Sequence, residues 1–339
     1  MGQTTGNLGQ HLGEDAAKIL SESMSKLAKN MCDIAQSNHS RNIKWQQIGV
    51  TIAGGHGKGN ALNQLNDPHG LFVNNDQSVY IADFRNHRIV EWRNGTNSGQ
   101  VVAGGKGEGN KMDQLKYATD VVFDKETDSL IVCDRHNRRV MRWPRGKRKP
   151  ETILTNIACY GLTMDDQKFL YVSDIENHSV KKYRLGETKG TIVAGGNGKG
   201  NGLNQLNLPI YLYVDRDQSV YISDTHNHRV MKWMKDAKEG IVVAGGRNQG
   251  DKPTQLSLPQ GIFVDHLSTV YVADGGNHRV MRWHKGATQG DMIVGGNGAG
   301  AGPNQLNCPG GLSLDQHENI YVVDYNNHRV QRFSIEATN

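Results

Sequence analysis

The sequence repeats itself about every 50 residues, and this period restricts the fold more than any other feature of the chain. A four-residue motif occurs as NHRI at 86, NRRV at 137, NHSV at 177 and NHRV at 227, 277 and 327. Only the step from 137 to 177 is short, because TILTNIACYGL replaces a longer glycine-rich connection there. A fixed period of this length indicates one supersecondary unit that recurs and packs against its neighbours.

Each unit reads as four short β-strands. A β-branched and aromatic run ends in aspartate just before each motif, for example VYIAD to Asp83 and VYISD to Asp224. A further apolar run precedes this one (GLFVN at 70–74), another follows the motif, and a last one ends the unit (VVAGG). Four short strands separated by turn residues are typical of a propeller blade. One aromatic residue per unit, near the end of the third strand, is expected to pack between blades: Trp92, Trp143, Tyr183, Trp233, Trp283 and Phe333.

The two ends of the repeat region complement each other. After the third strand of the sixth unit, HRVQRF, only SIEATN remains, so the last blade lacks its fourth strand. GVTIAGG at 49–55 matches QVVAGG at 100–105, yet it precedes the first complete unit. Pairing this spare strand with the last blade would remove an exposed sheet edge. The sequence therefore predicts an all-β, closed six-bladed β-propeller of four-stranded blades over residues 45–335.

The N-terminal segment, residues 1–44, follows a different pattern. Apolar residues alternate at steps of three and four, which is typical of one face of an amphipathic helix and predicts such a helix over about 14–36. Docking on the propeller and weak self-association through residues 17–34 both remain open, so the chain is expected to be a monomer or a weak self-associating species. The apolar positions are Leu20, Met24, Leu27, Met31 and Ile34.

Composition excludes several classes of protein. The chain has 339 residues, 36% of them hydrophobic, and a net charge of +5, which is mild for this size. No apolar run reaches the roughly 18–20 residues of a membrane helix, and the first residues lack the pattern of a signal peptide. The four cysteines have no zinc-ligand spacing. We therefore expect a soluble cytoplasmic protein with no membrane contact and no structural zinc.

The repeated unit, P-x-G-(apolar)-x-V-D followed by V-Y-(V/I)-(A/S)-D-x-x-N-H-R-V, resembles the NHL repeat over about residues 45–335. The resemblance implies a six-bladed propeller used for recognition, mainly of proteins and in some members of single-stranded RNA. Some NHL proteins carry zinc-binding ubiquitin-ligase modules before the propeller. The first 45 residues here hold one cysteine and no such ligand spacing, so ligase activity is not carried over.

The stretch DTHNHRVMKW at 224–233 has the ingredients of a metal or acid/base site. Asp224 and His228 nevertheless recur in nearly every unit, which favours a role in building each blade. The glycine-rich loops also recur and are followed by strands, whereas phosphate-binding loops lead into a helix. We therefore expect no cofactor and no metal.

Six-bladed enzymes of the lactonase and peptide-amidating-lyase types gather metal ligands around the central channel. The channel positions here hold one histidine and one carboxylate, which is too few for a metal that needs three or four protein ligands. We therefore predict a protein that is not an enzyme, and keep a lactonase-like or amidating-lyase-like enzyme as the second alternative. The positions are His69, Thr119, Tyr160, Ile210, Gln260 and Gly310, followed by Gly70, Asp120, Gly161, Tyr211, Gly261 and Gly311.

Blades differ from one another at the entries to the inner strands and at the variable pair of each D-x-x-N-H turn. Both sets should lie on one face, and an asymmetric partner needs different side chains on different blades. Aromatic residues and arginine are enriched in binding hot spots, which favours a protein partner. The predicted ligand-binding face comprises His69, Phe84, Arg85, Thr119, Asp120, Arg135, His136, Tyr160, Ile175, Glu176, Thr225, His226, Gln260 and Tyr325.

The stretch RWPRGKRKP at 142–150 is strongly basic. Loop charge in solvent is one interpretation, and an electrostatic footprint for RNA, extended by Arg135, His136, Arg138 and Arg139, is the other. RNA binding through this blade is the first alternative to a protein partner. The predicted basic patch comprises Arg142, Arg145, Lys147, Arg148 and Lys149.

Overall fold

The computed structural model describes residue 26 and residues 43–146 and 149–336. The described residues from 44 onward form one compact unit. The helix expected over 14–36 lies outside the described residues except at position 26, and Lys147 and Arg148 of the predicted basic patch also lie outside them. The two-domain division of the chain stays a prediction.

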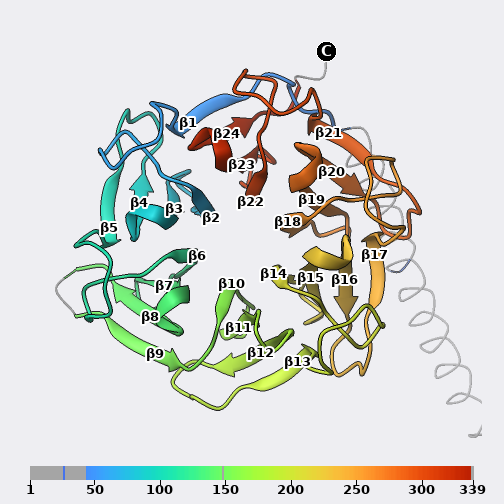
Figure 1. Ribbon diagram of the computed structural model, residues 1–339, viewed down its shortest axis with the longest axis horizontal. Coiled ribbons are helices and arrows are strands. Elements are labelled where there is room, and N and C mark those ends of the chain that lie inside the picture. The colour runs from blue at the N-terminus through green and yellow to red at the C-terminus, as the bar shows by residue number, and fades with distance from the viewer. Residues whose placement is uncertain (1–25, 27–42, 147–148, 337–339) are drawn as a thin grey trace, which may run out of the picture. The chain divides into compact units, whose positions relative to one another are not determined.

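Six four-stranded antiparallel sheets surround a central axis (Figure 1). We number these blades one to six along the chain, each from its inner strand outward. Blade one consists of β2 (Pro68–Val73), β3 (Val79–Asp83), β4 (Arg88–Trp92) and β5 (Gln100–Gly104). Blade two consists of β6 (Ala118–Asp124), β7 (Ser129–Asp134), β8 (Arg139–Pro144) and β9 (Glu151–Thr155). Blade three consists of β10 (Cys159–Met164), β11 (Phe169–Asp174), β12 (Ser179–Arg184) and β13 (Thr191–Gly195).

The remaining blades repeat this order. Blade four consists of β14 (Pro209–Val214), β15 (Val220–Asp224), β16 (Arg229–Trp233) and β17 (Ile241–Gly245). Blade five consists of β18 (Pro259–Val264), β19 (Val270–Asp274), β20 (Arg279–Trp283) and β21 (Asp291–Gly295). Blade six consists of β22 (Pro309–Leu314), β23 (Ile320–Asp324), β24 (Arg329–Phe333) and β1 (Val50–Gly54). Short 3₁₀ turns join the second and third strands of five blades: η1 (Phe84–Asn86), η2 (Arg135–Asn137), η3 (Thr225–Asn227), η4 (Gly275–Asn277) and η5 (Tyr325–Asn327).

The N-terminal strand closes the ring. β1 pairs antiparallel with β24, with Val50 opposite Arg332 and Gly54 opposite Arg329. An isolated bridge between Trp45 and Ile335 extends the contact. β1 covers an edge of β24 that would otherwise expose unpaired backbone groups. The predicted closed six-bladed propeller is therefore confirmed.

Apolar side chains fill the spaces between neighbouring blades. One buried cluster joins Trp92 and Val90 of blade one to Tyr321 and Val330 of blade six. Equivalent clusters join four further pairs of neighbouring blades, for example Tyr221 of blade four with Trp283 of blade five. The aromatic residue that ends the third strand thus packs between blades, as the sequence predicts, since large rings bury much apolar surface.

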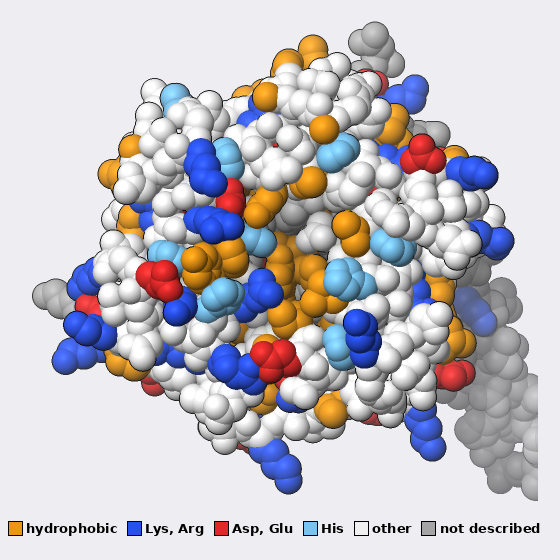
Figure 2. All heavy atoms as spheres, viewed as in Figure 1, with side chains coloured by type: hydrophobic (Ala, Val, Ile, Leu, Met, Phe, Trp, Pro, Cys, Tyr) orange, Lys and Arg blue, Asp and Glu red, His pale blue; other side chains and the backbone are white. Residues whose placement is uncertain are grey.

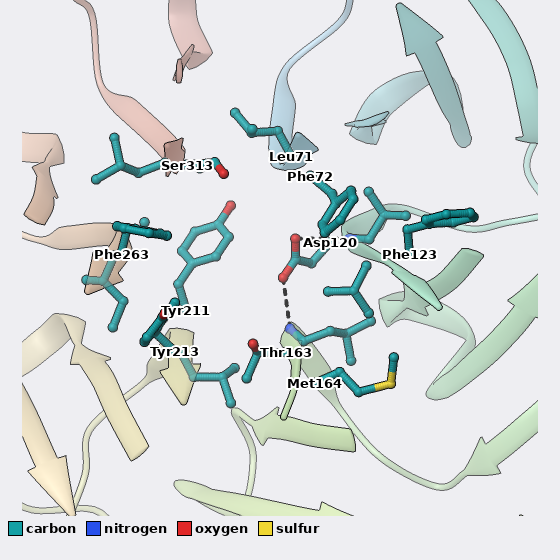
Figure 3. A pocket seen from close by; sticks show the side chains of 18 of the residues that line it. Leu71, Phe72, Asp120, Phe123, Thr163, Met164, Tyr211, Tyr213, Phe263 and Ser313 are labelled. Carbon is teal, nitrogen blue, oxygen red and sulfur yellow. Dashed lines mark hydrogen bonds between the residues drawn. The ribbon is translucent and has the colours of Figure 1, made fainter. Parts of the chain in front are cut away.

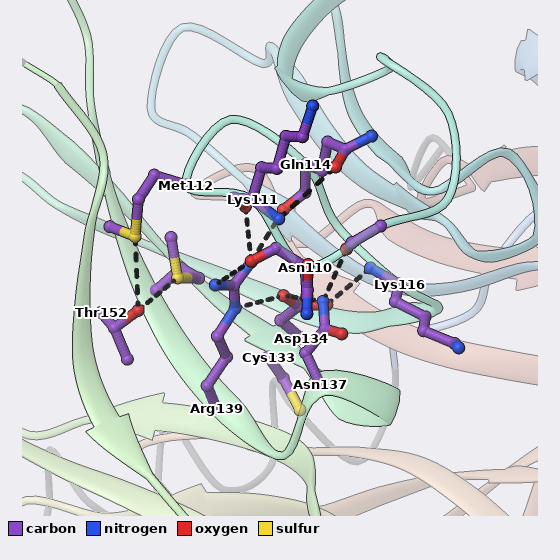
Figure 4. A network of polar contacts seen from close by, with 12 residues as sticks. Asn110, Lys111, Met112, Gln114, Lys116, Cys133, Asp134, Asn137, Arg139 and Thr152 are labelled. Atoms are coloured by element: carbon purple, nitrogen blue, oxygen red, sulfur yellow. Dashed lines mark hydrogen bonds and ion pairs between the residues drawn. The ribbon is translucent and has the colours of Figure 1, made fainter.

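The repeated aspartate, asparagine and arginine form one buried network in each of five blades (Figure 4). In blade two, Asp134 accepts hydrogen bonds from Asn137 Nδ2 at 2.8 Å and from Arg139 Nε at 2.7 Å. The Arg139 guanidinium also donates to the carbonyl oxygens of Asn110, Lys111 and Gln114. The glycine-rich loop therefore turns its carbonyls toward arginine, and the network serves the blade.

The repeated histidine links one blade to the next. His228 Nδ1 accepts the backbone N–H of Leu258 at 3.1 Å, and His87 Nδ1 accepts that of Tyr117 at 3.1 Å. Both histidines have a positive φ, and each ends a 3₁₀ turn. This hydrogen bond accounts for the recurrence of the histidine in the D-x-x-N-H motif.

A disulfide between Cys133 and Cys159 joins β7 of blade two to β10 of blade three. The sequence pattern did not predict this pairing. Cys308 is a free cysteine and is half-buried. No helix in the described part of the chain is both long enough and apolar enough to cross a membrane.

Candidate functional site

The 3₁₀ turns and the entries to the inner strands lie on one face of the ring, which we call the turn face. The N–H of Arg85 in η1 donates to the carbonyl of Asn66, just before β2, at 3.1 Å. The N–H of His136 in η2 donates to the carbonyl of Lys116, just before β6, at 3.2 Å. Viewed down the ring axis, hydrophobic side chains lie around the central hollow, with histidine, lysine and arginine side chains around them (Figure 2).

An aromatic cluster surrounds His69 at the start of β2. The ring centroid of His69 lies 4.2 Å from that of Phe84, 5.1 Å from that of Tyr325 and 5.7 Å from that of Tyr160. The Tyr160 hydroxyl and His69 Nδ1 are 2.7 Å apart and hydrogen-bonded. Ring closure thus brings side chains of blades one, three and six together. We call His69, Phe84, Arg135, Tyr160 and Tyr325 the central cluster.

The central cluster is positively charged through arginine rather than histidine. The Arg135 guanidinium lies 5.1 Å from the centroid of the Tyr160 ring, a cation–π contact. Burial, followed by the nearby Arg135, lowers the pKa of His69 to about 3, so its imidazole is neutral at physiological pH. Burial also raises the pKa of Tyr160, which keeps its hydroxyl protonated. Arg85 lies beside the cluster, where its Nε donates to Asp67 at 2.7 Å.

Tyr117 extends the cluster and is not among the residues that the sequence predicts for the ligand-binding face. Its ring centroid lies 4.8 Å from that of Phe84 and 4.4 Å from that of His136. Tyr117 has a positive φ, and its position in blade two is equivalent to that of Asp67 in blade one. Tyr117 lies two residues before the channel position of its blade. A comparison of the blades that began two residues earlier in each unit would have found this aromatic side chain.

Five predicted ligand-face residues are buried, so they support the surface more than they form it. Thr119 Oγ1 donates to the carbonyl of Tyr160 at 2.7 Å, and Thr225 Oγ1 donates to that of Pro259 at 2.8 Å. The exposed fractions of these residues are Phe84 9%, Thr119 0%, Asp120 6%, Tyr160 6% and Thr225 2%.

Four further predicted face residues are not members of the central cluster. Ile175 packs against Tyr160 and Tyr211, and Glu176 forms an ion pair with Arg138. His226 is exposed on blade four, and Gln260 is partly buried on blade five.

Arg145, one of the three described residues of the predicted basic patch, lies away from the arginines of the turn face. Arg145 lies in the β8–β9 connection, at the opposite end of β8 from η2. It pairs with Glu91 at 3.7 Å and Asp128 at 3.8 Å, and its guanidinium lies 5.6 Å from the ring centroid of Phe123. Arg142 pairs with Glu151 at 2.8 Å, and Lys149 is exposed. These ion pairs neutralise much of the charge of the described patch residues.

Among the residues that the structure describes, no group of three or more histidine, cysteine, aspartate or glutamate side chains is placed to hold a metal ion.

Comparison with known proteins identifies the repeat and the fold. The family model of the NHL repeat matches residues 65–92 and 306–333, which lie in blades one and six. No curated protein matches the chain.

Solved structures share the fold at low sequence identity. A protein of unknown function from Bacteroides thetaiotaomicron is 16% identical, with a TM-score of 0.69 over 86% of this chain and 77% of that chain. An auxiliary nutrient binding protein from the same organism is 15% identical, with a TM-score of 0.64 over 87% of this chain and 78% of that chain. A catalytically inactive virginiamycin B lyase from Staphylococcus aureus, with quinupristin, is 12% identical, with a TM-score of 0.55 over 86% of this chain and 99% of that chain.

Proposed function

We propose that this six-bladed propeller of NHL repeats is a non-catalytic recognition scaffold that binds a protein partner on its turn face. The observation that carries the proposal is the convergence of His69, Tyr160 and Tyr325 from three blades, with Arg135 beside them. None of these contacts repeats around the ring, so blade geometry alone does not require them. Rigid aromatic rings supply contact area at a low entropic cost, and arginine, like the aromatic residues, is enriched in binding hot spots.

The charge distribution favours a partner that presents acidic and apolar groups. Arg135 supplies positive charge, because no ion pair of a described residue neutralises it, whereas Arg85 already pairs with Asp67. Neutral His69 with Tyr325 supplies polar aromatic surface. An acidic side chain of the partner can pair with Arg135, while an apolar or aromatic side chain packs on Tyr325.

RNA binding through blade two is the alternative partner class. Arg142 and Arg145 already pair with carboxylates, and Arg145 lies at the end of blade two away from Arg135. A continuous phosphate-binding track needs aligned, available cations. The arrangement therefore supports a protein partner over RNA.

An enzyme is the second alternative. The likeness to virginiamycin B lyase is one of fold, and fold alone does not transfer an activity. A screen for lactone hydrolysis, together with metal analysis of the purified chain, tests this alternative. Turnover or stoichiometric bound metal would contradict the non-catalytic proposal.

The partner class is tested by affinity capture with the purified chain, from extract with and without nuclease treatment. A protein partner should be recovered equally in both samples. Loss of the captured material after nuclease treatment would contradict the proposal and support RNA.

Surface variants then test the turn face. We expect Arg85→Ala, Arg135→Ala and Tyr325→Ala each to weaken partner binding by roughly 1–3 kcal/mol, because each truncates an accessible hot-spot side chain. Tyr160 is avoided because it is buried and its loss would disturb the fold. Calorimetric titration measures the effect, and His226→Ala, on the same face but outside the central cluster, is the matched control. Full affinity in all three variants would place the site elsewhere.

A further inference from the structure

A cavity of about 460 Å³ lies in the central channel and is lined by the inner strands of all six blades (Figure 3). The inner strands start at the turn face, and the lining comes from their later residues and from the turns that follow them, such as Lys125 and Lys168. The cavity therefore opens on the face opposite the turn face. Its volume suits a small organic molecule.

Among the described residues, the layer of inner-strand positions that forms the floor of the cavity has two side chains larger than glycine, those of Asp120 and Tyr211. The same layer holds Gly70, Gly161, Gly261 and Gly311 on the other four inner strands. A Cβ at Gly70 would lie 2.1 Å from Asp120 Oδ1, so glycine there leaves room for the carboxyl group. Asp120 and Tyr211 are each 6% exposed, and both point into the cavity (Figure 3).

The hydrogen bonds of these two floor residues are incomplete. Asp120 accepts the backbone N–H of Val121 at 3.0 Å and that of Leu162 at 2.8 Å. Within the described part of the chain, no lysine or arginine forms an ion pair with Asp120, and the buried hydroxyl of Tyr211 has no hydrogen-bond partner. Burial raises the pKa of Asp120 to about 7, so the carboxylate that forms near neutral pH lacks a countercharge. A buried carboxylate without a cation is costly, and a bound cation would remove that cost.

The walls of the cavity are largely apolar. Three aromatic residues line the cavity, namely Phe72, Tyr213 and Phe263. The ring centroids of Tyr213 and Phe263 are 5.2 Å apart. Thr163 and Ser313 supply hydroxyl groups from blades three and six. Aromatic rings favour both an apolar ligand body and a neighbouring positive charge.

We propose that this cavity binds a small organic amine in its ammonium form. The ammonium group lies against the Asp120 carboxylate and the Tyr211 hydroxyl, and the apolar body packs against Phe72, Tyr213 and Phe263. This site is distinct from the turn face, so the inference goes beyond the proposed function and does not depend on it.

Titration of the full chain with benzylamine, phenethylamine and tryptamine tests the proposal. We expect at least one of these amines to bind with one-to-one stoichiometry in calorimetry at pH 7.5. Phenethyl alcohol and 3-phenylpropionate have similar bodies but lack the positive charge. We expect each of them to bind at least about tenfold more weakly than the best amine, because a charged hydrogen bond to a buried group is lost.

Asp120→Asn should weaken amine binding at least about tenfold, because the amide keeps an acceptor for Leu162 N–H but loses the charge. Tyr211→Phe should weaken it about threefold, because one neutral hydrogen bond is lost. Asp166→Asn is the matched control, since Asp166 is an exposed carboxylate among the lining residues. We expect it to bind amines as the natural chain does, and thermal unfolding checks that each variant is folded.

The pH dependence of amine binding is a separate readout. Tyr160 on β10 and Tyr211 on β14 are the titratable groups that interact with Asp120, and both stay protonated because burial raises their pKa values. The charged groups among the lining residues are Lys125, Asp165, Asp166 and Lys168. Amine affinity should rise from pH 6 to pH 8 as Asp120 loses its proton, and this rise should disappear in Asp120→Asn.

Three results would each overturn the proposal: no binding of any of the three amines, equal binding of phenethyl alcohol, or unchanged amine binding by Asp120→Asn. If Asp120→Asn does not fold, Tyr211→Phe and the comparison of amine with alcohol on the natural chain decide. Tyr325→Ala, which tests the turn face, should leave amine affinity unchanged. Loss of amine binding in that variant would contradict the separation of the two sites.

Discussion

At the scale of single residues, the arginine after each D-x-x-N-H turn connects a strand to the glycine-rich loop. In blade four, Arg229 Nε donates to Asp224 at 2.7 Å, and its other nitrogens donate to the carbonyls of Asn201, Gly202 and Gln205. Blade three lacks this arginine, and there Lys181 pairs with Asp174 at 2.9 Å. The equivalent aspartates of the two blades, Asp224 and Asp174, thus pair with different cations.

Arg229→Ala should lower the free energy of unfolding by about 3–5 kcal/mol, because it leaves buried Asp224 without its countercharge. Lys181→Ala should cost less, about 1–3 kcal/mol, because it also leaves the buried Asp174 without its cation, but Lys181 is partly exposed and has no loop-carbonyl hydrogen bonds to lose. Urea denaturation of both variants measures the difference. Equal losses would show that the arginine network adds nothing beyond an ordinary ion pair.

The repeated histidines make stability depend on pH. Nδ1 of each accepts a backbone N–H from the next blade, so the neutral ring is the form that fits the fold. Burial lowers the pKa of four of them, namely His87, His178, His228 and His328. Their pKa in the unfolded chain is about 6.5, so below that pH the unfolded state binds more protons than the native state.

We therefore expect the histidine contribution to the free energy of unfolding to be complete above about pH 6.5 and to decrease as pH falls below that value. Urea denaturation at pH 7.5, 6.5 and 5.5 measures this decrease. Blade two has arginine, Arg138, at the position equivalent to His228. The variant His228→Arg should therefore show a smaller decrease in the free energy of unfolding as pH falls. Equal stability of the natural chain at pH 7.5 and 5.5 would contradict the assigned hydrogen bonds.

At the scale of elements, the disulfide between β7 and β10 joins the two blades with the shortest connection. The stretch between β9 and β10 has no glycine-rich loop, so blade three lacks the arginine network that holds such a loop elsewhere. Cys133 and Cys159 are both buried in the cluster between these blades. A covalent bond there stabilises the junction of blades two and three.

The double variant Cys133→Ala, Cys159→Ala should be less stable by about 2–4 kcal/mol, because a disulfide restricts the unfolded chain. Urea denaturation with and without reductant measures this. The natural chain should lose stability in reductant, whereas the variant should not change. Insensitivity of the natural chain would contradict the bond. Disulfides persist mainly in oxidising compartments, so the same measurement bears on the predicted cytoplasmic location.

At the scale of the whole molecule, β1 is the element that makes the ring continuous. Trp45, just before it, is 1% exposed, and its Nε1 donates to the carbonyl of Glu318 at 2.8 Å. The side chain of Gln47 donates to the carbonyl of Ile293 in blade five at 2.8 Å. Residues 45–54 therefore connect blades five and six as well as completing blade six.

Deletion of residues 1–40 should leave a propeller that unfolds in one cooperative transition, because the contacts of Trp45 and β1 remain. Deletion of residues 1–55 should give an insoluble or non-cooperatively unfolding protein, because β24 loses its partner strand and exposes an edge. Circular dichroism during thermal unfolding compares the two. A cooperative transition in the longer deletion would show that the ring does not need β1.

The sequence by itself determined the blade number, the closure and the structural role of the D-x-x-N-H motif. Each follows from local geometry that every blade repeats, so identical residues such as Asp224 and Asn227 recur wherever the same hydrogen bonds form. The tertiary structure alone decided which non-repeating residues meet. His69 and Tyr160 are separated by 91 positions, and Asp120 and Tyr211 come from different blades, as do Cys133 and Cys159. The repeat period places such residues around one axis or on one face. Which side chains touch depends on their sizes and orientations in the closed ring, and these do not follow from the period.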